Sequence, residues 1–512
     1  MSIQEQFLNH INEGYQFKGE SMRIGTAMID GKVVNGANIY AALKTLNRHG
    51  LIAGATGTGK TKTLQGFVEA LSLAGVPSLV MDIKGDLSGL AQPGNPHPKI
   101  DERAALLNIE WKPTAFPCEF LSISSEPGAK MRATISEFGP VLLSKIFGLN
   151  DVQSGVVSII FKYCDDNNMP LLDVKDFRKV LQFISNEGKE EIEREYGLVS
   201  SSSVGAIMRS LLEIEQQGAD LFFGERSFEV EDLMRKDANN YGFINILRLT
   251  DMQAKPKLFS TFMLCLLAEV YATLPEKGDA EKPELIIFID EAHLIFKEAS
   301  KALLDQLDTI VKLIRSKGVG LVFVTQDPTD LPENILGQLG LKIQHALRAF
   351  TEKDRKAIKS TAENYPISDF YKTDEIITKM GIGEALVTVL NEKGIPTPLA
   401  HTMLCAPQSR MDILTTSELD SAAQKSALVI KYNQLIDSES AYEILIKKLA
   451  QHKNVIEEEI EQRTTQRKRE EPSIIEKMAK SSVARTIVRE LTRGLLGVLG
   501  LGGTARRNRR LF

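Results

Sequence analysis

The chain alternates short apolar runs with longer segments of helical periodicity. Leu64, Phe67, Val68 and Leu71 recur at the spacing of one helix face, which predicts a helix over residues 61–73. The short apolar runs suit the buried strands of a parallel sheet, because such strands are covered by helices on both faces. The predicted strands are residues 51–53, 76–83, 242–247, 285–289, 320–325, 342–347 and 384–390. The pattern therefore predicts an α/β fold with a mainly parallel sheet.

Other parts of the chain lack this alternation. Residues 23–34 have the pattern of a hairpin that leads into the sheet. Between residues 128 and 234 strand signals are few, and the periodicity favours helices over 131–147, 152–165, 173–184 and 203–216. Residues 417–471 are helical in pattern and highly charged. We therefore expect a helical insertion within the sheet domain and a helical carboxyl-terminal region.

These changes of pattern predict five segments. They are a short extension with a hairpin at 1–45, the first part of the core at 46–127, the helical insertion at 128–234, the second part of the core at 235–406, and a charged helical region with a basic Gly/Leu/Arg tail at 407–512.

Composition narrows the class of protein. With 512 residues, 43% of them hydrophobic, the chain is expected to form two or three globular units. The four cysteines are scattered without a C-x-x-C pair, which favours reduced thiols over a metal site or disulfides. No apolar run approaches the roughly 20 residues that span a bilayer, and the first residues lack the pattern of a secretory signal. We expect a cytoplasmic protein with no integral membrane segment.

Charge limits how the protein could bind nucleic acid. A formal net charge of −5 argues against attraction over the whole surface, although it permits a local basic channel. Arginines are concentrated in the carboxyl-terminal tail, where they could contact anionic nucleic acid or lipid. A flexible, solubilising end explains the same composition. These arginines are Arg485, Arg489, Arg493, Arg506, Arg507, Arg509 and Arg510.

The segment from Gly54 to Thr61 fits the phosphate-binding pattern G-x-x-x-x-G-K-[ST] and lies between a predicted strand and a predicted helix. Glycines let successive N–H groups point at one anion, and the start of the helix adds positive dipole there. Lys60 is expected to reach the β- and γ-phosphates of ATP, and Thr61 to bind Mg²⁺. The expected nucleotide-binding residues are Gly54, Ala55, Thr56, Gly57, Thr58, Gly59, Lys60, Thr61 and Thr63.

A second group of polar residues follows later strands. Asp290 and Glu291 come directly after the strand 285–289, at the edge where open α/β sheets bind ligands. Asp290 suits Mg²⁺ and Glu291 suits activation of the attacking water, although an acidic pair could also cap a helix. His293 is interpreted as a supporting or structural residue. Gln326 ends the strand 320–325 and is a candidate to orient water beside the γ-phosphate.

Four motifs in this order resemble the HerA/FtsK branch of RecA-like P-loop ATPases. They are GATGTGKT at 54–61, VMDIKGDLSGL at 80–90, FIDEAH at 288–293 and RSKGVGLVFVTQ at 315–326. Within that branch the chain is similar to the YjgR-like group of HerA-type helicases, over roughly residues 45–410. The resemblance implies ring-shaped homohexamers with nucleotide at subunit interfaces and motor activity on DNA.

A ring would require an arginine that reaches the γ-phosphate of a neighbouring subunit. Arg348 and Arg355 follow the strand 342–347 and are candidates, whereas Arg315 precedes the strand 320–325 and could act within its own subunit. Each could instead be an ordinary surface arginine. Asp82, Lys84 and Asp86 lie at the end of the strand 76–83, near the expected catalytic edge, so they could contact Mg²⁺-bound water or a loop of the next subunit.

The resulting hypothesis is an ATP-hydrolysing motor, a hexameric DNA translocase or helicase-like enzyme that uses ATP and Mg²⁺. The alternative is a nucleotide-switched scaffold that recruits or remodels a protein partner through the insertion at 128–234. A small-molecule kinase is less favoured, because kinases usually lack the arrangement of Glu291 and Gln326 that suits activation of water.

Overall fold

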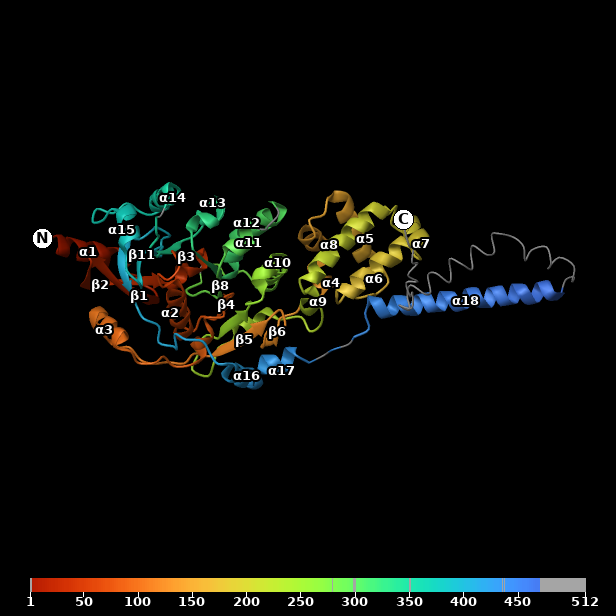
Figure 1. Cartoon of the computed structure of the whole chain (residues 1–512), viewed down its shortest axis with the longest axis horizontal. Coiled ribbons are helices and arrows are strands. Elements are labelled where there is room, and N and C mark those ends of the chain that lie inside the picture. The colour runs from red at the N-terminus through yellow and green to blue at the C-terminus, as the bar shows by residue number, and fades with distance from the viewer. Residues whose placement is uncertain are drawn as a thin grey trace, which may run out of the picture. The chain divides into compact units, whose positions relative to one another are not determined.

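A computed structural model describes residues 2–278, 280–297, 301–349, 351–434, 436 and 438–469. The chain divides into two units, with the boundary between Tyr442 and Glu443. The first unit is an α/β body, in which strands form one large sheet and helices cover it (Figure 1). The arginine-rich tail, on which the sequence prediction of an anion-binding or solubilising end falls, lies outside the described residues.

One twelve-stranded sheet runs through the described part of the first unit, in the order β2-β1-β12-β11-β10-β3-β9-β8-β4-β7-β5-β6. The strands are β1 (Ser21–Ile29), β2 (Lys32–Ala42), β3 (Gly50–Ala53), β4 (Ser78–Asp82), β5 (Cys118–Ser122), β6 (Ala129–Lys130), β7 (Ile244–Arg248), β8 (Leu285–Ile289), β9 (Val319–Thr325), β10 (Leu341–Gln344), β11 (Glu384–Thr388) and β12 (Ala400–Leu404). The predicted α/β fold with a mainly parallel sheet is confirmed.

The sheet has a parallel part and an antiparallel part. From β10 to β6 all neighbouring strands are parallel, whereas β11, β12, β1 and β2 add antiparallel pairs at one side. Strands β3, β4, β8 and β9 are buried along their whole length, as their continuous apolar runs predict. The predicted amino-terminal hairpin joins the antiparallel part through β1 and β12, with Gly25 opposite Leu404.

Helices supply the two outer layers and the insertion. The longer helices of the first unit are α1 (Ile3–Tyr15), α2 (Lys60–Leu73), α3 (Pro98–Leu107), α4 (Ile135–Ile146), α5 (Asp151–Asp166), α6 (Val174–Ser185), α8 (Ser201–Gln216), α10 (Pro256–Thr273), α12 (Lys301–Ile314), α14 (Glu352–Glu363) and α16 (Thr416–Lys425). The shorter ones are α7 (Lys189–Glu195), α9 (Ala219–Phe222), α11 (His293–Lys297), α13 (Glu333–Leu336), α15 (Thr373–Lys379) and α17 (Ala427–Tyr432).

The helices of the predicted insertion pack against one another and against α10 and α12 of the core. Helices α4 to α9 gather at the end of the body beyond β5 and β6 (Figure 1). Each of the longer helices begins with a side-chain cap; for example, Thr134 accepts the N–H of Glu137, whose carboxylate accepts the N–H of Thr134. Aromatic side chains fill the interior, with Phe177 packed between Phe147 and Phe161.

The described part of the carboxyl-terminal region is helical and consists of separate helices. Ser426 ends α16 and caps α17 by accepting the N–H of Val429, so the chain turns there. The second unit contains most of α18 (Ala441–Arg469). Among the described residues, none of the helices has the length and apolar character needed to cross a membrane.

Candidate active site

The phosphate-binding pattern lies in the loop between β3 and α2. Gly54, Gly57 and Gly59 have φ values of 149°, 78° and 109°, which a residue with a side chain adopts only with strain. A Cβ atom on Gly54 would lie 2.5 Å from the Cβ of His345, so this turn also needs glycine for space. The sequence therefore fixes the path of the loop through its glycines.

The start of α2 is suited to an anion. Gly59 precedes the helix and provides no side-chain cap, so the first N–H groups have no intrahelical acceptor. Uncapped N–H groups and the helix dipole together favour a phosphate at this position. The N–H of Ala55 is bound to the carbonyl of Ala346 at 2.9 Å, which fixes the beginning of the loop.

Lys60 is buried and turned toward its own loop. Its Nζ donates to the carbonyls of Gly54, at 2.7 Å, and Ala55, at 3.2 Å. Burial lowers its pKa, and the nearby charge of Lys84 lowers it further, while Glu291 and Asp290 oppose the shift. Lys60 and Lys84 thus repel each other beside an uncapped helix start. An anionic ligand at this position would stabilise both charges.

The threonines of the loop have different surroundings. Thr61 lies in the first turn of α2 and is half-buried. Thr63 is buried, and its hydroxyl contacts the carbonyl of Gly59 at 3.2 Å and Nε2 of His345 at 2.9 Å. Thr56 donates its hydroxyl hydrogen to Oε1 of Gln326 at 3.3 Å. The structure thus joins the phosphate loop to Gln326, whereas Thr63 is bound to the protein itself.

Strand register brings the second group of predicted residues to the same edge. Ala53 is paired with Thr325, Ile289 with Phe323, and Ile289 with Met81. Because these strands are parallel and in register, the residues that follow them emerge together. The phosphate loop, Gln326, Asp290–Glu291 and the segment after β4 therefore share one edge of the sheet.

Asp290 and Glu291 are each only 5% exposed. Burial raises the pKa of Asp290 to about 7, helped by the charge of Glu291 and opposed by Lys84. Glu291 is also affected by burial, but its hydrogen bonds to Lys84 and Gln326 and the charge of His293 hold its pKa below the ordinary value. A carboxylate that stays charged is a suitable base, and a buried carboxyl group beside it is a suitable ligand for a cation.

Glu291 lies beside two side chains, of which Lys84 binds it. Lys84 Nζ forms an ion pair with its Oε1, and Nδ1 of His293 lies 3.2 Å from its Oε2. Glu291 itself has a φ of 47°, an uncommon backbone conformation for a residue with a side chain. Among the described residues, neither Nδ1 of His293 nor Oε2 of Glu291 has a hydrogen-bond partner, so the supporting role of His293 stays a prediction.

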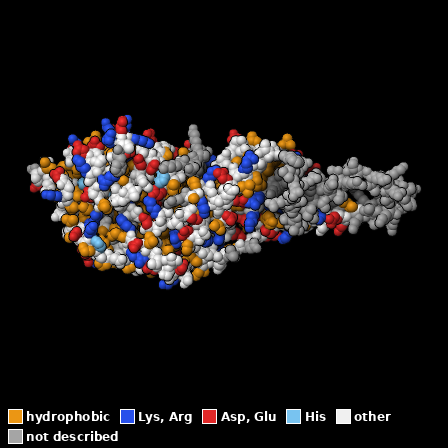
Figure 2. Space-filling model, viewed as in Figure 1, with side chains coloured by type: hydrophobic (Ala, Val, Ile, Leu, Met, Phe, Trp, Pro, Cys, Tyr) orange, Lys and Arg blue, Asp and Glu red, His pale blue; other side chains and the backbone are white. Residues whose placement is uncertain are grey.

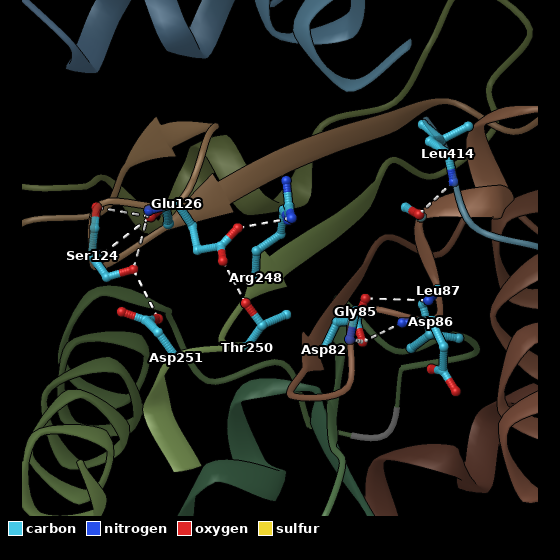
Figure 3. A network of polar contacts seen from close by, with 12 residues as sticks. Asp82, Gly85, Asp86, Leu87, Ser124, Glu126, Arg248, Thr250, Asp251 and Leu414 are labelled. Carbon is cyan, nitrogen blue, oxygen red and sulfur yellow. Dashed lines mark hydrogen bonds and ion pairs between the residues drawn. The ribbon is translucent and has the colours of Figure 1, made fainter. Parts of the chain in front are cut away.

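The loop after β4 positions Lys84. The buried carboxylate of Asp82 accepts three N–H groups, from Gly85 at 2.7 Å and from Asp86 and Leu87 at 3.2 Å each (Figure 3). Asp82 therefore acts on the shape of the loop, whereas Lys84 reaches the site. The acidic residue at the end of β4 followed by Lys and Gly is the sequence signal for this arrangement.

A polar network lies beside this loop, at the ends of β5 and β7. Glu126 forms an ion pair with Arg248 at 2.8 Å and a hydrogen bond with Thr250, and Ser124 donates to Asp251 at 3.0 Å (Figure 3). These contacts fix the two loops that continue the catalytic edge. The sequence analysis missed this network because the residues after β5 and those after β7 are more than 120 positions apart in the chain.

His345 is a further residue that the sequence analysis missed. It is fully buried, its N–H donates to the carbonyl of Ala53 at 2.7 Å, and its side chain supports Gly54 and Thr63. It gave no distinct sequence signal, because the predicted strand 342–347 also contains Lys342 and Gln344; the strand itself ends at Gln344.

The three candidate arginines occupy different places. Arg348 and Arg355 are exposed, and Arg348 donates to the carbonyl of Thr378 at 3.1 Å. Arg315 precedes β9, so it lies at the opposite end of that strand from Gln326 and near His49, which precedes β3. Within one subunit the structure therefore does not bring Arg315 to the site. The choice of the arginine that contacts the γ-phosphate in a neighbouring subunit stays a prediction.

The fold and the edge just described are those of a P-loop NTPase. The model of the family described as helicase HerA-like C-terminal matches residues 29–507, and the chain belongs to this family. The predicted HerA relationship is confirmed, while the YjgR-like group stays a prediction.

Two relatives are named as DNA double-strand break repair helicases HerA. The protein of Sulfolobus acidocaldarius is 25% identical over 351 residues, covering 65% of this chain and 62% of the relative. That of Sulfurisphaera tokodaii is 23% identical over 354 residues, covering 66% and 63%. The chain thus matches less than two thirds of each relative's length.

A solved structure has a similar fold. The bacterial conjugative coupling protein TrwBdeltaN70, in its unbound monoclinic form, aligns with a TM-score of 0.50 and 15% identity, over 77% of this chain and 97% of that chain. This likeness supports the predicted RecA-like architecture and concerns the fold alone.

Proposed function

We propose that the chain binds ATP with Mg²⁺ and hydrolyses it. The observation that carries this proposal is the convergence of the phosphate loop, Asp290–Glu291 and Gln326 at one edge of the parallel sheet. Hydrolysis of a γ-phosphate needs a loop that holds the phosphates, carboxylates that bind Mg²⁺ and activate water, and a group that orients the water. Membership of the HerA-like family adds support.

Each group has a defined role in this proposal. The N–H groups at the start of α2 and the ammonium of Lys60 hold the β- and γ-phosphates. The oxygens of Thr61 and Asp290 hold Mg²⁺, which neutralises phosphate charge when bound. Glu291 orients and deprotonates the attacking water, and Gln326 orients the same water. Lys84 keeps Glu291 charged and in place.

We further propose that hydrolysis drives movement along DNA by a homohexamer in the cytoplasm. The names of the relatives as DNA repair helicases support a DNA substrate. Arg348 and Arg355 are exposed, as an arginine that contacts the γ-phosphate in a neighbouring subunit must be. On the face seen in Figure 2, basic and acidic side chains are interspersed, so DNA contact is expected to use a local surface.

Steady-state ATPase assays test the catalytic assignment. Lys60→Ala and Glu291→Gln should each lower turnover at least about 100-fold, because one removes phosphate binding and the other the base. The matched controls Lys32→Ala and Glu13→Gln change exposed residues and should retain the wild-type rate. Full activity of Glu291→Gln would contradict the assignment.

The DNA substrate is tested separately. Duplex DNA should increase the ATPase rate of the wild-type chain severalfold, and the increase should weaken as salt is raised because phosphate contacts release counterions. An ATPase rate that no DNA or RNA changes would argue against a nucleic-acid motor while leaving ATP hydrolysis intact.

A further inference from the structure

Two loops lie next to each other at the carboxyl ends of β4 and β7. Strand register places Asp82, the last residue of β4, opposite Arg248, the last residue of β7. The pairing continues beyond the strands, because the N–H of Leu249 donates to the carbonyl of Asp82 at 3.0 Å. The residues after β7 therefore run beside the loop 83–88, which carries Lys84.

Thr250 approaches that loop at a glycine. Gly85 has a φ of 75°, and a Cβ atom built on it would lie 2.9 Å from Cγ2 of Thr250. Glycine thus permits both the turn of the backbone and the close approach of the threonine methyl group. Because Gly85 directly follows Lys84, a displacement of Thr250 acts on the backbone next to Lys84.

Glu126 binds both Thr250 and Arg248. Its Oε1 accepts the hydroxyl hydrogen of Thr250, and its Oε2 forms an ion pair with Nη2 of Arg248 at 2.8 Å (Figure 3). The side chains of Glu126 and Arg248 are 20% and 15% exposed, so water screens their attraction only in part. The hydrogen bond fixes the hydroxyl of Thr250 and therefore the direction in which its methyl group points.

Glu126 is itself fixed by the loop after β5. Its N–H donates to Oγ of Ser124 at 3.3 Å, and Nζ of Lys130 donates to the carbonyls of Ser124 and Glu126, at 2.7 Å each. Oγ of Ser124 also donates to the carboxylate of Asp251 at 3.0 Å. Since Asp251 directly follows Thr250, the loops after β5 and β7 are joined at two neighbouring positions.

The loop 83–88 is held from other directions as well. Within it, the carboxylate of Asp82 accepts the N–H groups described above. On another side, Oγ of Ser88 accepts the N–H of Leu414 at 2.9 Å (Figure 3). The contact of Thr250 with the loop is the one that depends on Glu126.

The place of Lys84 matters because its ammonium group pairs with Glu291. Burial acts to raise the pKa of Glu291, whereas the hydrogen bond and charge of Lys84 are the strongest effects that hold it below its ordinary value. If Lys84 moves away, Glu291 stays buried without this compensation, so its pKa rises. Asp290, His293 and Lys60 also face Glu291, and a shift of Lys84 leaves them in place.

We propose that Glu126 is a positioning residue for ATP hydrolysis, which holds Lys84 against Glu291 through Thr250 and Gly85. The strand order β8-β4-β7-β5 sets the order of these contacts. The inference rests on the proposed ATPase function and adds a group that acts on the base from three strands away. Because Glu126 contacts the ends of β5 and β7, its effect on Glu291 should pass through Lys84.

The experiment measures kcat and KM for ATP hydrolysis by the full chain with MgCl₂ over a range of pH. Glu126→Gln removes the charge and one acceptor, so it should lower kcat about three- to tenfold near neutral pH and change KM less than about twofold. The acid limb of kcat should move to higher pH, because Glu291 is then protonated more readily.

The outcomes separate the inference from the proposed function. A wild-type chain that hydrolyses ATP, with the same kcat and pH profile in Glu126→Gln, would overturn the inference while the ATPase function stands. A wild-type chain without ATPase activity would reject both.

Thr250→Ser provides a second, milder variant. It keeps the hydroxyl group for Glu126 and removes the methyl group that approaches Gly85. It should lower kcat about two- to threefold and move the acid limb in the same direction. A wild-type pH profile in this variant would contradict the path through Gly85.

A double variant distinguishes positioning of Lys84 from a general loosening of the fold. In the Lys84→Met protein, adding Glu126→Gln should lower kcat by less than about 1.5-fold, because the contact through which Glu126 acts is already absent. A loss as large as in the wild-type background would show that Glu126 acts by another route and would overturn the inference.

Glu215→Gln is the matched control. It breaks an ion pair with Arg178 inside the insertion, in which the glutamate side chain is 16% exposed, similar to that of Glu126. This variant should keep the wild-type kcat and pH profile. If it reproduced the changes of Glu126→Gln, the loss would follow from any broken ion pair, and the inference would be wrong.

Discussion

Lys84 links the loop after β4 to Glu291 at the edge of the sheet that carries the phosphate loop. It forms an ion pair with Glu291 and lies on a loop shaped by Asp82. Lys84→Met should lower kcat at least about tenfold, because an unpaired, buried Glu291 loses its charge and its orientation. The Kd of ADP should change by less than about threefold, since the phosphate loop is intact.

Rapid-quench turnover and calorimetry measure these two effects on the same protein. Lys44→Met is the matched control, because Lys44 forms an ion pair with Glu281 at the surface, 2.9 Å long. An unchanged kcat in Lys84→Met would show that Glu291 works without this contact.

His49 gives a prediction for stability against pH. Nε2 of its buried ring donates to the carbonyl of Val311 at 2.8 Å, and Nδ1 accepts the N–H of Leu321 at 3.0 Å, so both ring nitrogens are used by the neutral form. Burial lowers its pKa from 6.5 to about 4, with the charge of Arg315 adding to the shift. The unfolded chain therefore takes up this proton first as pH falls.

The stabilisation by neutral His49 is present above pH 6.5 and is lost as pH falls toward 4, a change of roughly 3 kcal/mol. Denaturant unfolding at several pH values measures it. His49→Gln keeps a donor and an acceptor without a titrating group, so its stability should fall less between pH 6.5 and 4. His10→Gln, at an exposed histidine, should follow the wild-type profile. Identical profiles for all three would contradict the prediction.

Functional residues were predictable from sequence where they belong to a motif of neighbouring residues. The loop from Gly54 to Thr61 and the pair Asp290–Glu291 needed only their own letters and the neighbouring apolar runs. The contact of Lys84 with Glu291 was not predictable, because it joins residues more than 200 positions apart through the order of strands β4 and β8. His345 was missed for the same reason.

At the level of elements, helix α2 depends on the chain segment 408–411 that runs along it. Glu69 is buried and accepts N–H groups of Gln408 and Ser409, and burial raises its pKa while these bonds oppose the shift. Glu69→Ala should lower the free energy of unfolding by about 3 kcal/mol, because buried donors lose their acceptor.

Denaturant midpoints of purified proteins measure this loss. Glu13→Ala changes an exposed residue of helix α1, so it should stay within about 0.5 kcal/mol of wild type. A Glu69→Ala protein as stable as that control would mean that water replaces the lost acceptor.

Strands were predictable where their run of apolar residues is uninterrupted. Strands β8 and β9 are continuous apolar runs and were placed almost to the residue. Strands β5 and β12 were missed, because Glu119 interrupts the first run and His401 and Thr402 interrupt the second. All three polar residues are buried and have partners in the fold; Glu119 pairs with Arg235 and His401 with Glu384, each at 3.0 Å.

At the scale of the whole molecule, the proposed homohexamer predicts how two inactive variants behave when their subunits are mixed. If Arg348 acts on a neighbour, Arg348→Ala should lower the ATPase rate by about 10³-fold or more. Lys60→Ala should lower it by at least about 100-fold, because it removes phosphate binding. Mixing the two inactive proteins should restore up to about one quarter of the wild-type rate, because some interfaces then combine an intact loop with an intact arginine.

The same mixture made with Arg355→Ala distinguishes the two candidates, and mass in solution with a non-hydrolysable ATP analogue reports whether a ring forms. A protein that stays monomeric with nucleotide and DNA would exclude both arginines. The insertion at 128–234 remains the predicted partner-binding surface of the alternative, scaffold function. Its helices were predictable from periodicity, but a surface for a partner has no comparable sequence signal.

The position of β3 in the sheet has a consequence for synthesis of the protein. This strand carries the phosphate loop, yet its two neighbours contain Val322 and Leu341, which pair with Gly50. A ribosome that adds about 5–20 residues per second reaches those neighbours on the order of ten seconds or more after making β3. Strand β3 therefore lacks both neighbours until β10 has been synthesised, so the phosphate loop takes its place in the sheet only late in translation.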